Sequence, residues 1–421
     1  MQSSVHAVWV CLPFAGLLLS IALIPGIAPR FWLRRMGVVA AGWSLALIPV
    51  LGFPLWAHDT ARAMTESYLP FVAVLGGLYV IAGGVLLRGG PGGRPWGNTV
   101  VLALGAVLAL ILGTAGAAMV IIQPLLRSNA HRQRRFHLML FLILLVGNTA
   151  GALTPIGNPP LLVGLLRGVP FLWPAQNLIG IWALASGLLL GAFFAIDWWF
   201  ARTEPPPPPV ERFSLRGWIN VVLVLIVAAS VTIPASPVLF AVAAGAFSFW
   251  MTPRAVRREN DFAWHPMTEV AVLFVGIFIT LEPVSDLLRQ GLDGPFAAAL
   301  RWTMDGPGDG SGDMRPLAGF WLAGLLSAFL DNAPAYLVFF DFAGIQPRAM
   351  TTGQGAALRA ISAGAVMFGG LTYIGNASNL MLRAVAAHRG VRMPAFVPFM
   401  LLASAVMLPV LGVVSWVFFR G

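Results

Sequence analysis

The sequence predicts an all-α polytopic membrane protein made of two inverted-topology repeats, each with a re-entrant hairpin and a broken transmembrane helix. Of its 421 residues, 58% are hydrophobic and 10% are charged, and its apolar runs repeatedly reach the roughly 20 residues that a spanning helix needs. The pentapeptide Thr-Pro-Ile-Gly-Asn at 154–158 recurs 218 positions later as Thr-Tyr-Ile-Gly-Asn at 372–376. Arginines gather in short loops between the apolar runs, as in cytoplasmic loops.

The composition excludes several classes of protein. A net charge of +10 would suggest nucleic-acid binding in a soluble chain, but here the charge lies in loops between apolar runs. The chain has no lysine, so it lacks the Gly-Lys-Ser/Thr motif of ATP-driven transport. Its single cysteine, Cys11, allows neither a disulfide within the chain nor a multi-cysteine metal site, and no histidine has a second ligand at metal spacing. We therefore expect no cofactor and no resident metal.

Basic residues also indicate where the protein resides. Exclusive use of arginine is typical of a GC-rich bacterial genome, so we expect a bacterial inner membrane. The N-terminus lacks the basic region of a cleavable signal, and Arg30, Arg34 and Arg35 follow the first apolar run instead. We interpret that run as a retained helix.

The first half, residues 1–200, should begin with three ordinary crossings. They are expected at about 7–28, 37–57 and 67–87. Loops at 30–35 and 88–94 carry arginine while the loop at 58–66 is mixed, which places the N-terminus outside.

The next apolar run, about 98–126, has arginines at both ends. One crossing cannot place both ends in the cytoplasm, whereas a re-entrant hairpin can, with its tip at 113–116. Two short crossings, or one crossing with a frustrated charge bias, are the alternatives. A broken helix at about 138–166 and a helix at 175–198 should follow.

A proline run at 205–209 marks a stiff cytoplasmic linker at 201–216. The second repeat, 217–421, restarts the order. Its elements are expected at 217–233, 236–252, 267–288, a hairpin at 316–346, a broken helix at 356–388 and a helix at 394–419. An acidic loop at 289–315 fits the outside.

The offset between the two pentapeptides also places Thr114 of the first hairpin tip on Asn332 of the second. The repeat therefore covers the hairpin and the broken helix in each half, and chance recurrence becomes unlikely. Charge places the start of the first half outside and the start of the second half inside. The two copies should thus have opposite orientations, with hairpins that enter from opposite faces.

The two breaks are the candidate binding site. Threonine hydroxyls, asparagine amides and freed carbonyls supply oxygen ligands there, and the starts of the half-helices supply partial positive charge. The expected lining residues are Thr154, Gly157 and Asn158 in one half and Thr372, Gly375, Asn376, Ser378 and Asn379 in the other. Alternatively, these residues only permit close packing and cap the helices.

Asp331 is the most informative charged residue. It lies at the second hairpin tip beside Asn332, where an ionised carboxylate without a partner is costly. Such a group should bind a cation or a proton, and helix capping is the plainer alternative. Glu282, Asp286 and Asp341 are weaker candidates, for which solvent exposure is the commoner explanation.

Two further sets of polar residues are expected to have no role in the site. Asp197 has the position of an ordinary boundary residue at the end of an apolar run. His131, His137 and His265 are expected in cytoplasmic loops.

The chain resembles the ion-transporter superfamily of NhaD-type sodium/proton antiporters, arsenite efflux pumps, citrate carriers and dicarboxylate/sodium symporters. The residues that carry this resemblance are 147–160, 329–334 and 372–379. It implies inverted repeats, often in a homodimer with a scaffold and a moving transport domain. It also implies that Thr114, Asn148, Thr154 and Asn158 meet Asn332, Thr372 and Asn376 around one central site.

The chain departs from these relatives at Asn158, where many of them have aspartate, and this leaves Asp331 as the main buried acid. An acidic tip should repel a carboxylate, which counts against citrate. The prediction is a secondary transporter that exchanges Na⁺ for H⁺ by alternating access, with Asp331 as the proton-coupling group. Proton-coupled arsenite efflux and citrate or dicarboxylate transport are the alternatives. A membrane enzyme is disfavoured because no nucleophile and base accompany Asp331, and a channel because the breaks suggest an occluded site.

Overall fold

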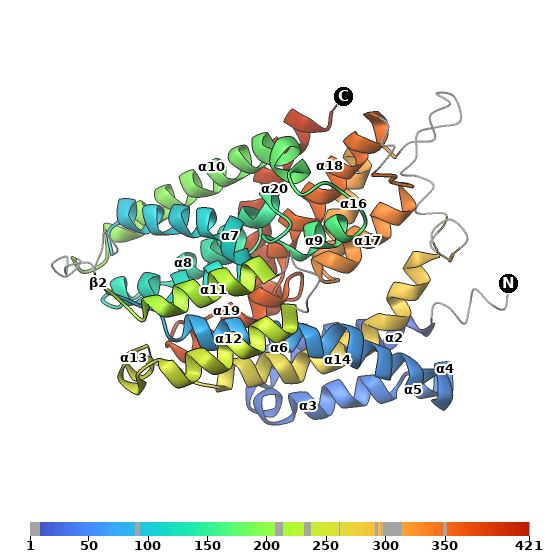
Figure 1. Ribbon diagram of the computed structural model, residues 1–421, viewed down its shortest axis with the longest axis horizontal. Helices are drawn as coiled ribbons and strands as arrows, with labels where there is room; N and C mark the ends of the chain where they lie inside the picture. The colour runs from blue at the N-terminus through green and yellow to red at the C-terminus, as the bar shows by residue number, and fades with distance from the viewer. Residues whose placement is uncertain are drawn as a thin grey trace.

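The computed structural model describes residues 9–88, 93–206, 214–230, 237–260, 262–290, 294, 295, 297, 314–347 and 352–420. These residues are almost entirely helical (Figure 1). Seven of the described helical segments are long and apolar enough to cross a membrane. The predicted class, a polytopic α-helical membrane protein, is confirmed, with one small two-stranded sheet that the sequence did not predict.

The first helices differ from the predicted runs at their ends. Helices α2 (Cys11–Ile27) and α3 (Pro29–Leu45) follow each other directly, so the arginines at 30–35 lie on helix α3 and not in a loop. A short α4 (Ile48–Leu51) ends at Gly52, whose φ of 78° breaks the helix. The predicted crossing at 37–57 is therefore wrong in its boundaries, because Gly52 divides it.

The predicted loop at 58–66 is helical. Helix α5 (Phe53–Arg62), a π-helical turn (Ala63–Tyr68) and α6 (Leu69–Ala82) form one continuous segment. Arg62 donates to the carboxylates of Glu282 and Asp286, the latter at 2.9 Å. Because protein partners satisfy its charge, this polar stretch does not need to form a loop.

Helix α7 (Pro95–Ser128) forms the first hairpin. A straight helix would hold Asn98 and Asn129 about 47 Å apart, yet their amides exchange hydrogen bonds of 2.9 and 2.8 Å. The chain reverses at Gly113, which has φ 73° and ψ 159°, values that suit glycine. The two arms therefore lie side by side, and the alternative of one straight crossing is wrong.

The first broken helix follows and lies at the centre of the fold. It consists of α8 (Phe136–Phe141), a π-helical turn (Leu142–Val146), a 3₁₀ turn η3 (Thr149–Leu153), the extended break and α9 (Pro159–Leu166). In the apolar segment Phe136–Leu153, 94% of the residues are buried, against 17% in Arg34–Leu51. The irregular backbone is thus enclosed by protein, as a lipid environment requires.

Helix α10 (Trp173–Ala201) follows, and after it strand β2 (Ser214–Arg216) pairs antiparallel with β1 (Leu86–Arg88). Of the predicted proline run, only residues 205 and 206 lie within the described residues. Helices α11 (Trp218–Ser230), α12 (Pro237–Met251), α13 (Arg254–Glu259) and α14 (His265–Arg289) follow. Most of the predicted acidic loop at 289–315 lies outside the described residues.

The second hairpin and broken helix run opposite to the first pair. The hairpin is α16 (Pro316–Ser327) and α17 (Asn332–Phe342), and the broken helix is α18 (Thr352–Met367), a 3₁₀ turn η5 (Phe368–Leu371), the break and α19 (Ala377–His388). In Figure 1, α7 enters from the end that carries β1 and β2, at the left, whereas α16 and α17 lie toward the right. Helix α20 (Phe396–Phe418) closes the chain. The inverted architecture agrees with the prediction; the repeat boundaries at 200 and 217 stay predictions.

Candidate functional site

A threonine fastens each break to the hairpin of its own repeat. Thr154 Oγ1 donates to the carbonyl of Leu110 at 2.6 Å and accepts the N–H of Gly157 at 2.9 Å. Thr372 Oγ1 donates to the carbonyl of Ala328 and accepts the N–H of Gly375 at 3.0 Å. Leu110 and Ala328 are separated by the same offset as the two threonines, so the repeat in sequence is also a repeat of hydrogen bonds.

Glycines let the backbone close tightly around each break. A Cβ on Gly157 would lie 2.5 Å from the carbonyl oxygen of Gly151, and one on Gly375 would lie 2.7 Å from that of Gly369. Both distances are too short for a contact between a carbon atom and an oxygen atom that are not bonded to each other. Gly157 and Gly375 are therefore required for packing, and Gly157 also presents its carbonyl to the N–H of Thr114 at 3.0 Å.

Asn148 connects the two repeats. Its Nδ2 donates to Asn379 Oδ1 at 2.9 Å, and its Oδ1 accepts from Asn376 Nδ2 at 3.2 Å. Asn376 also donates to the carbonyl of Gly147 at 3.0 Å, and the Ser378 hydroxyl lies 3.3 Å from the same carbonyl. The first broken helix thus meets the second through side chains that are all buried.

A second contact joins the first break to the second hairpin. Asn332 Nδ2 donates to Asn158 Oδ1 at 2.6 Å, and Asn158 Nδ2 lies 3.3 Å from the carbonyl of Asn148. The other amide atom, Asn332 Oδ1, is buried and has no hydrogen-bond partner among the described residues. A chain of amides therefore crosses the centre of the molecule and ends at an oxygen that can still accept a donor or bind a cation.

Asp331 begins helix α17. Its carboxylate accepts the N–H of Asn332 at 2.9 Å, and its side chain is partly exposed. Among the described residues, no arginine pairs with it. The predicted capping role is present, and the carboxylate keeps oxygen lone pairs for a further ligand.

Three helices start at this centre. Asn158 precedes α9, Asp331 precedes α17 and Asn376 precedes α19. Helix starts carry partial positive charge and free N–H groups. The predicted residues from both hairpin tips and both breaks are thus brought together. Around them lie the partly positive starts of three helices and the carboxylate of Asp331.

The weaker acidic candidates lie elsewhere and have arginine partners. Glu282 and Asp286 pair with Arg62. Asp341 pairs with Arg167 at 2.5 Å, with 35% and 46% of the two side chains exposed. Ion pairing, rather than exposure alone, accounts for these three residues.

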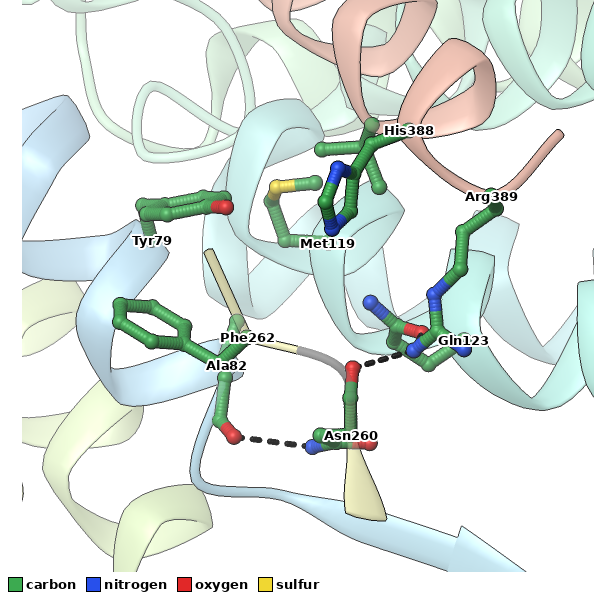
Figure 2. A pocket seen from close by; sticks show the side chains of 10 residues that line it. Tyr79, Ala82, Met119, Gln123, Asn260, Phe262, His388 and Arg389 are labelled. Carbon is green, nitrogen blue, oxygen red and sulfur yellow. Dashed lines mark hydrogen bonds between the residues drawn. The ribbon is translucent and has the colours of Figure 1, made fainter. Parts of the chain in front are cut away.

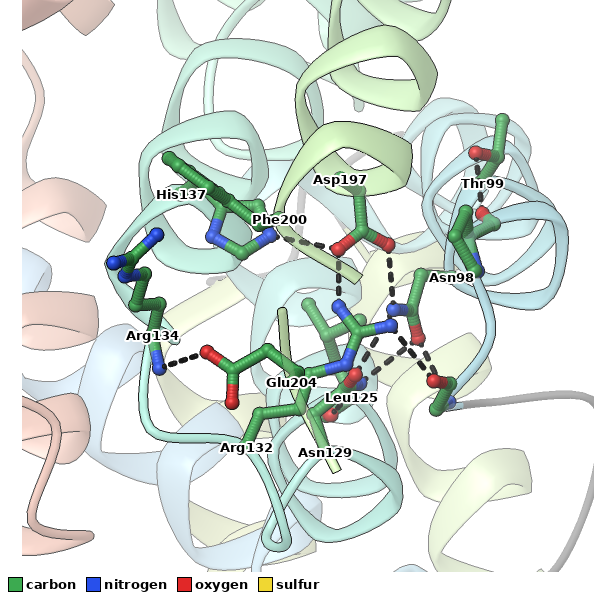
Figure 3. A network of polar contacts seen from close by, with 12 residues as sticks. Asn98, Thr99, Leu125, Asn129, Arg132, Arg134, His137, Asp197, Phe200 and Glu204 are labelled. Atoms are coloured by element: carbon green, nitrogen blue, oxygen red, sulfur yellow. Dashed lines mark hydrogen bonds and ion pairs between the residues drawn. The ribbon is translucent and has the colours of Figure 1, made fainter. Parts of the chain in front are cut away.

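A buried polar network at the base of the first hairpin was not predicted (Figure 3). Asp197 is fully buried on α10, where its Oδ1 accepts from Arg132 and from His137 Nε2 at 2.8 Å, and its Oδ2 accepts from Asn98 at 2.8 Å. Arg132 also donates to the carbonyl of Gly93 at 2.7 Å. The interpretation of Asp197 as a boundary residue is wrong, and so is the placement of His137 in a loop, because His137 lies buried on α8.

Glu204 extends this network toward the surface. Its carboxylate accepts the backbone N–H groups of Gln133 and Arg134 at 2.8 and 2.9 Å. Burial acts to raise the pKa of Glu204, but these two hydrogen bonds and the charges of Arg132 and Arg134 together hold the pKa below its ordinary value. The network fixes both ends of the hairpin to α8 and α10.

Comparison with known proteins agrees with this architecture. A search against curated proteins finds no match. The model of a family described as "Putative citrate transport" matches twice, at residues 3–239 and again at 235–419. The two successive matches agree with a repeated architecture and together span nearly the whole chain. The chain is a member of the family described as "Putative citrate transport", and hence a multi-pass secondary transporter.

Proposed function

We propose that this protein exchanges Na⁺ for H⁺ by alternating access, with Asp331 as the group that binds the cation and the proton in turn. The observation that carries the proposal is the position of Asp331 at the central hairpin tip without an arginine partner among the described residues. By contrast, Asp197, Glu282 and Asp286, which lie on other apolar helices, each pair with arginine. An ionised carboxylate at depth needs compensation, and a transported cation would provide it.

Neighbouring oxygens support the cation site. Hard cations prefer carboxylate, amide and carbonyl oxygens, and Asn332 Oδ1 is buried without a partner among the described residues. When Asp331 takes up a proton, the charge that attracts the cation disappears and the cation is released. Exchange follows if the site opens to one side with the proton and to the other with the cation.

Citrate transport is the second candidate. The family description favours it, and so do the starts of α9, α17 and α19, because their partial positive charge suits carboxylates. Asp331 opposes it unless a proton or cation neutralises the carboxylate.

Asp331→Asn tests the coupling role without removing the helix cap, since asparagine caps helices as well as aspartate does. We expect the variant in proteoliposomes to lose Na⁺ uptake driven by an outward proton gradient. Asp341→Asn is the matched control, because it removes an exposed acid from the same helix; it should transport normally. Full proton-driven flux in Asp331→Asn would exclude the proposed coupling.

Parallel uptake of citrate and arsenite separates the alternatives. Citrate uptake that does not compete with the exchange of Na⁺ for H⁺ would favour the second candidate. Citrate uptake that persists in Asp331→Asn would also favour it, if the wild-type protein shows no Na⁺ flux. Arsenite flux driven by protons would favour the export of a neutral hydroxide.

A further inference from the structure

Three buried polar atoms of the second repeat lack a hydrogen-bond partner among the described residues. They are Asn332 Oδ1 at the start of α17, and Ser362 Oγ and Arg359 Nε on α18. Leaving a buried donor or acceptor unpaired is costly, and such atoms in folded proteins commonly mark a bound water or ligand. Helices α17 and α18 pack against each other, so one set of bound molecules could serve all three atoms.

Asn332 and Tyr336 lie on one face of α17, because residues four positions apart are neighbours on a helix. Both contact α9. Asn332 donates to Asn158 Oδ1 at 2.6 Å. A Cβ on Gly164 would lie only 2.5 Å from the Tyr336 hydroxyl, so glycine leaves the room that this hydroxyl occupies. Tyr336 is 1% exposed, and its hydroxyl is therefore enclosed by protein.

Tyr336 also faces Ser362 of α18. The two side chains interact, but their hydroxyls do not reach hydrogen-bond geometry, and the Ser362 hydroxyl therefore keeps no partner within the described chain. Arg359 lies three residues before Ser362, on the same face of α18, and is partly exposed. Polar groups thus continue from Asn332, past Tyr336 and Ser362, to Arg359. We call these four residues the polar track.

The polar track leads away from the centre of the molecule. Helix α18 runs from Thr352 to the break that follows Met367. At 1.5 Å per residue, Ser362 lies about 8 Å and Arg359 about 12 Å before Met367. Only a short connection separates the end of α17 at Phe342 from the start of α18. The track therefore leads from the tip of the second hairpin toward its base.

The unpartnered atoms select the kind of molecule that could occupy the track. Asn332 Oδ1 needs a donor or a cation, whereas Arg359 Nε needs an acceptor. A metal cation would satisfy only the first atom, and an anion only the second. Water both donates and accepts, and a buried water typically makes about three hydrogen bonds to such groups. Water is therefore the occupant that fits all three atoms.

We propose that ordered water occupies the polar track and carries the proton between Asp331 and the end of the molecule away from β1 and β2. This proposal rests on the exchange of Na⁺ for H⁺ proposed above. Asp331 adjoins the track, because its carboxylate accepts the N–H of Asn332. A protonated water chain would transfer H⁺ to a free lone pair of the carboxylate, which becomes neutral as the chain returns to water. Na⁺ at the central site would displace the water from Asn332 Oδ1.

Toward β1 and β2, the surroundings of a small cavity are different (Figure 2). This cavity has a volume of about 20 Å³, enough for about one water molecule, and no central asparagine is among the described residues that line it. Its Tyr79 hydroxyl donates to the carbonyl of Ala263. Its Asn260 amide donates to the carbonyls of Gly83 and Val85 at 2.9 and 2.7 Å. Protein groups thus satisfy these two side chains, in contrast to the polar track.

Exchange of a thiol proton tests the water independently of transport. Cys11 is the only cysteine, so Ser362→Cys in a Cys11→Ala background places one thiol in the track. Its S–H stretching band in the infrared spectrum shifts when D₂O reaches it. Ser327→Cys is the matched control, because Ser327 is equally buried but donates to the carbonyl of Ala365 at 2.6 Å. We expect exchange in Ser362→Cys to be at least about tenfold faster than in Ser327→Cys. Equal rates would overturn the proposal.

Transport in proteoliposomes tests the proton route. Ser362→Val replaces the hydroxyl by a methyl group, and Ser362→Thr is the control of similar shape that keeps a hydroxyl. We expect Ser362→Val to slow the exchange of Na⁺ for H⁺ by at least about tenfold. Exchange of Na⁺ for Na⁺ needs no proton and should stay close to that of the wild type. Unchanged exchange of Na⁺ for H⁺ in Ser362→Val, or an equal loss in Ser362→Thr, would refute the route.

Failure of this proposal can be distinguished from failure of the proposed function. A wild-type protein that does not exchange Na⁺ for H⁺ would refute the proposed function and, with it, the proton route. The thiol measurement would then still decide whether water occupies the track. Normal exchange of Na⁺ for H⁺ in the wild type, together with equal thiol exchange in Ser362→Cys and Ser327→Cys, would refute the track alone.

Discussion

Replacing Asp197 by alanine should destabilise the protein by about 3–5 kcal/mol, the cost of breaking a buried ion pair by removing one partner. Asp197 is 0% exposed and Arg132 is 4% exposed, so water cannot replace the lost carboxylate. The substitution also removes the acceptor for His137 and one acceptor for Asn98. Arg132 would remain buried with only the carbonyl of Gly93 as a described partner.

The expected change in unfolding temperature follows from chain length. An unfolding entropy of about 2.1 cal/mol/K per residue amounts to about 0.9 kcal/mol/K for 421 residues. The midpoint should therefore fall by about 3–6 °C. This midpoint can be measured by heating the protein in detergent to a series of temperatures. At each temperature, size-exclusion chromatography gives the fraction of protein that stays monodisperse.

Two variants test the reasoning behind that value. Asp341→Ala breaks a largely exposed pair with Arg167 and should cost at most about 1 kcal/mol. The double variant Asp197→Ala/Arg132→Met leaves no unpaired guanidinium and should be more stable than Asp197→Ala alone. The network would not stabilise the base of the hairpin if Asp197→Ala lowered stability no more than Asp341→Ala does. The same conclusion would follow if the double variant were no more stable than Asp197→Ala.

Two further predictions concern the breaks and the loop after α7. Gly375→Ala should lower stability and transport together, because its Cβ would lie 2.7 Å from the carbonyl oxygen of Gly369. Gly412→Ala is the control: its new Cβ meets no neighbouring atom within 4 Å, so the variant should be neutral or slightly stabilising. Heating and flux assays on both variants test the difference. Glu204→Gln should flatten the dependence of stability on pH. The pKa of Glu204 is lowered on folding, so its contribution is present above the ordinary glutamate pKa and is lost as pH falls through the folded value. An unchanged pH profile of the melting temperature in Glu204→Gln would contradict this.

Much of the fold could be predicted from sequence because its signals are local. Arginines at both ends of 98–126 predicted a hairpin, and the mutual hydrogen bonds of Asn98 and Asn129 confirm it. The repeated pentapeptide located both breaks. Hydropathy predicted a loop at 58–66, where the structure is helical. The prediction failed because the partners of Arg62 lie in the other half of the chain and no local pattern reveals them.

Part of the site could also be predicted, and part could not. The offset between the pentapeptides paired Thr114 with Asn332 and so indicated both tips. The network around Asp197 joins α7, α8 and α10, and such pairings depend on tertiary packing. The only signal was a set of polar residues, Asn98, Asn129 and Arg132, at the ends of apolar runs.

The two repeats share the hydrogen bonds that close each break but not those at the base of the first hairpin. The threonine bonds to Leu110 and Ala328 obey the offset because each break needs the same closure onto its hairpin. The base of the first hairpin does not obey it: the same offset replaces Asn98 by Pro316, Asn129 by Pro347 and Asp197 by Ser415. These three positions of the second repeat therefore cannot form an equivalent of the buried network.

This difference gives the two hairpins different contacts at their bases. The first is fixed to α8 and α10 by a buried carboxylate with three donors. The second is attached near its base by the partly exposed pair of Arg167 and Asp341, which is a weak link in water. Asp331 lies at the tip of this second hairpin. A change in the charge of Asp331 would accordingly act at the tip of the hairpin whose base lacks the buried network.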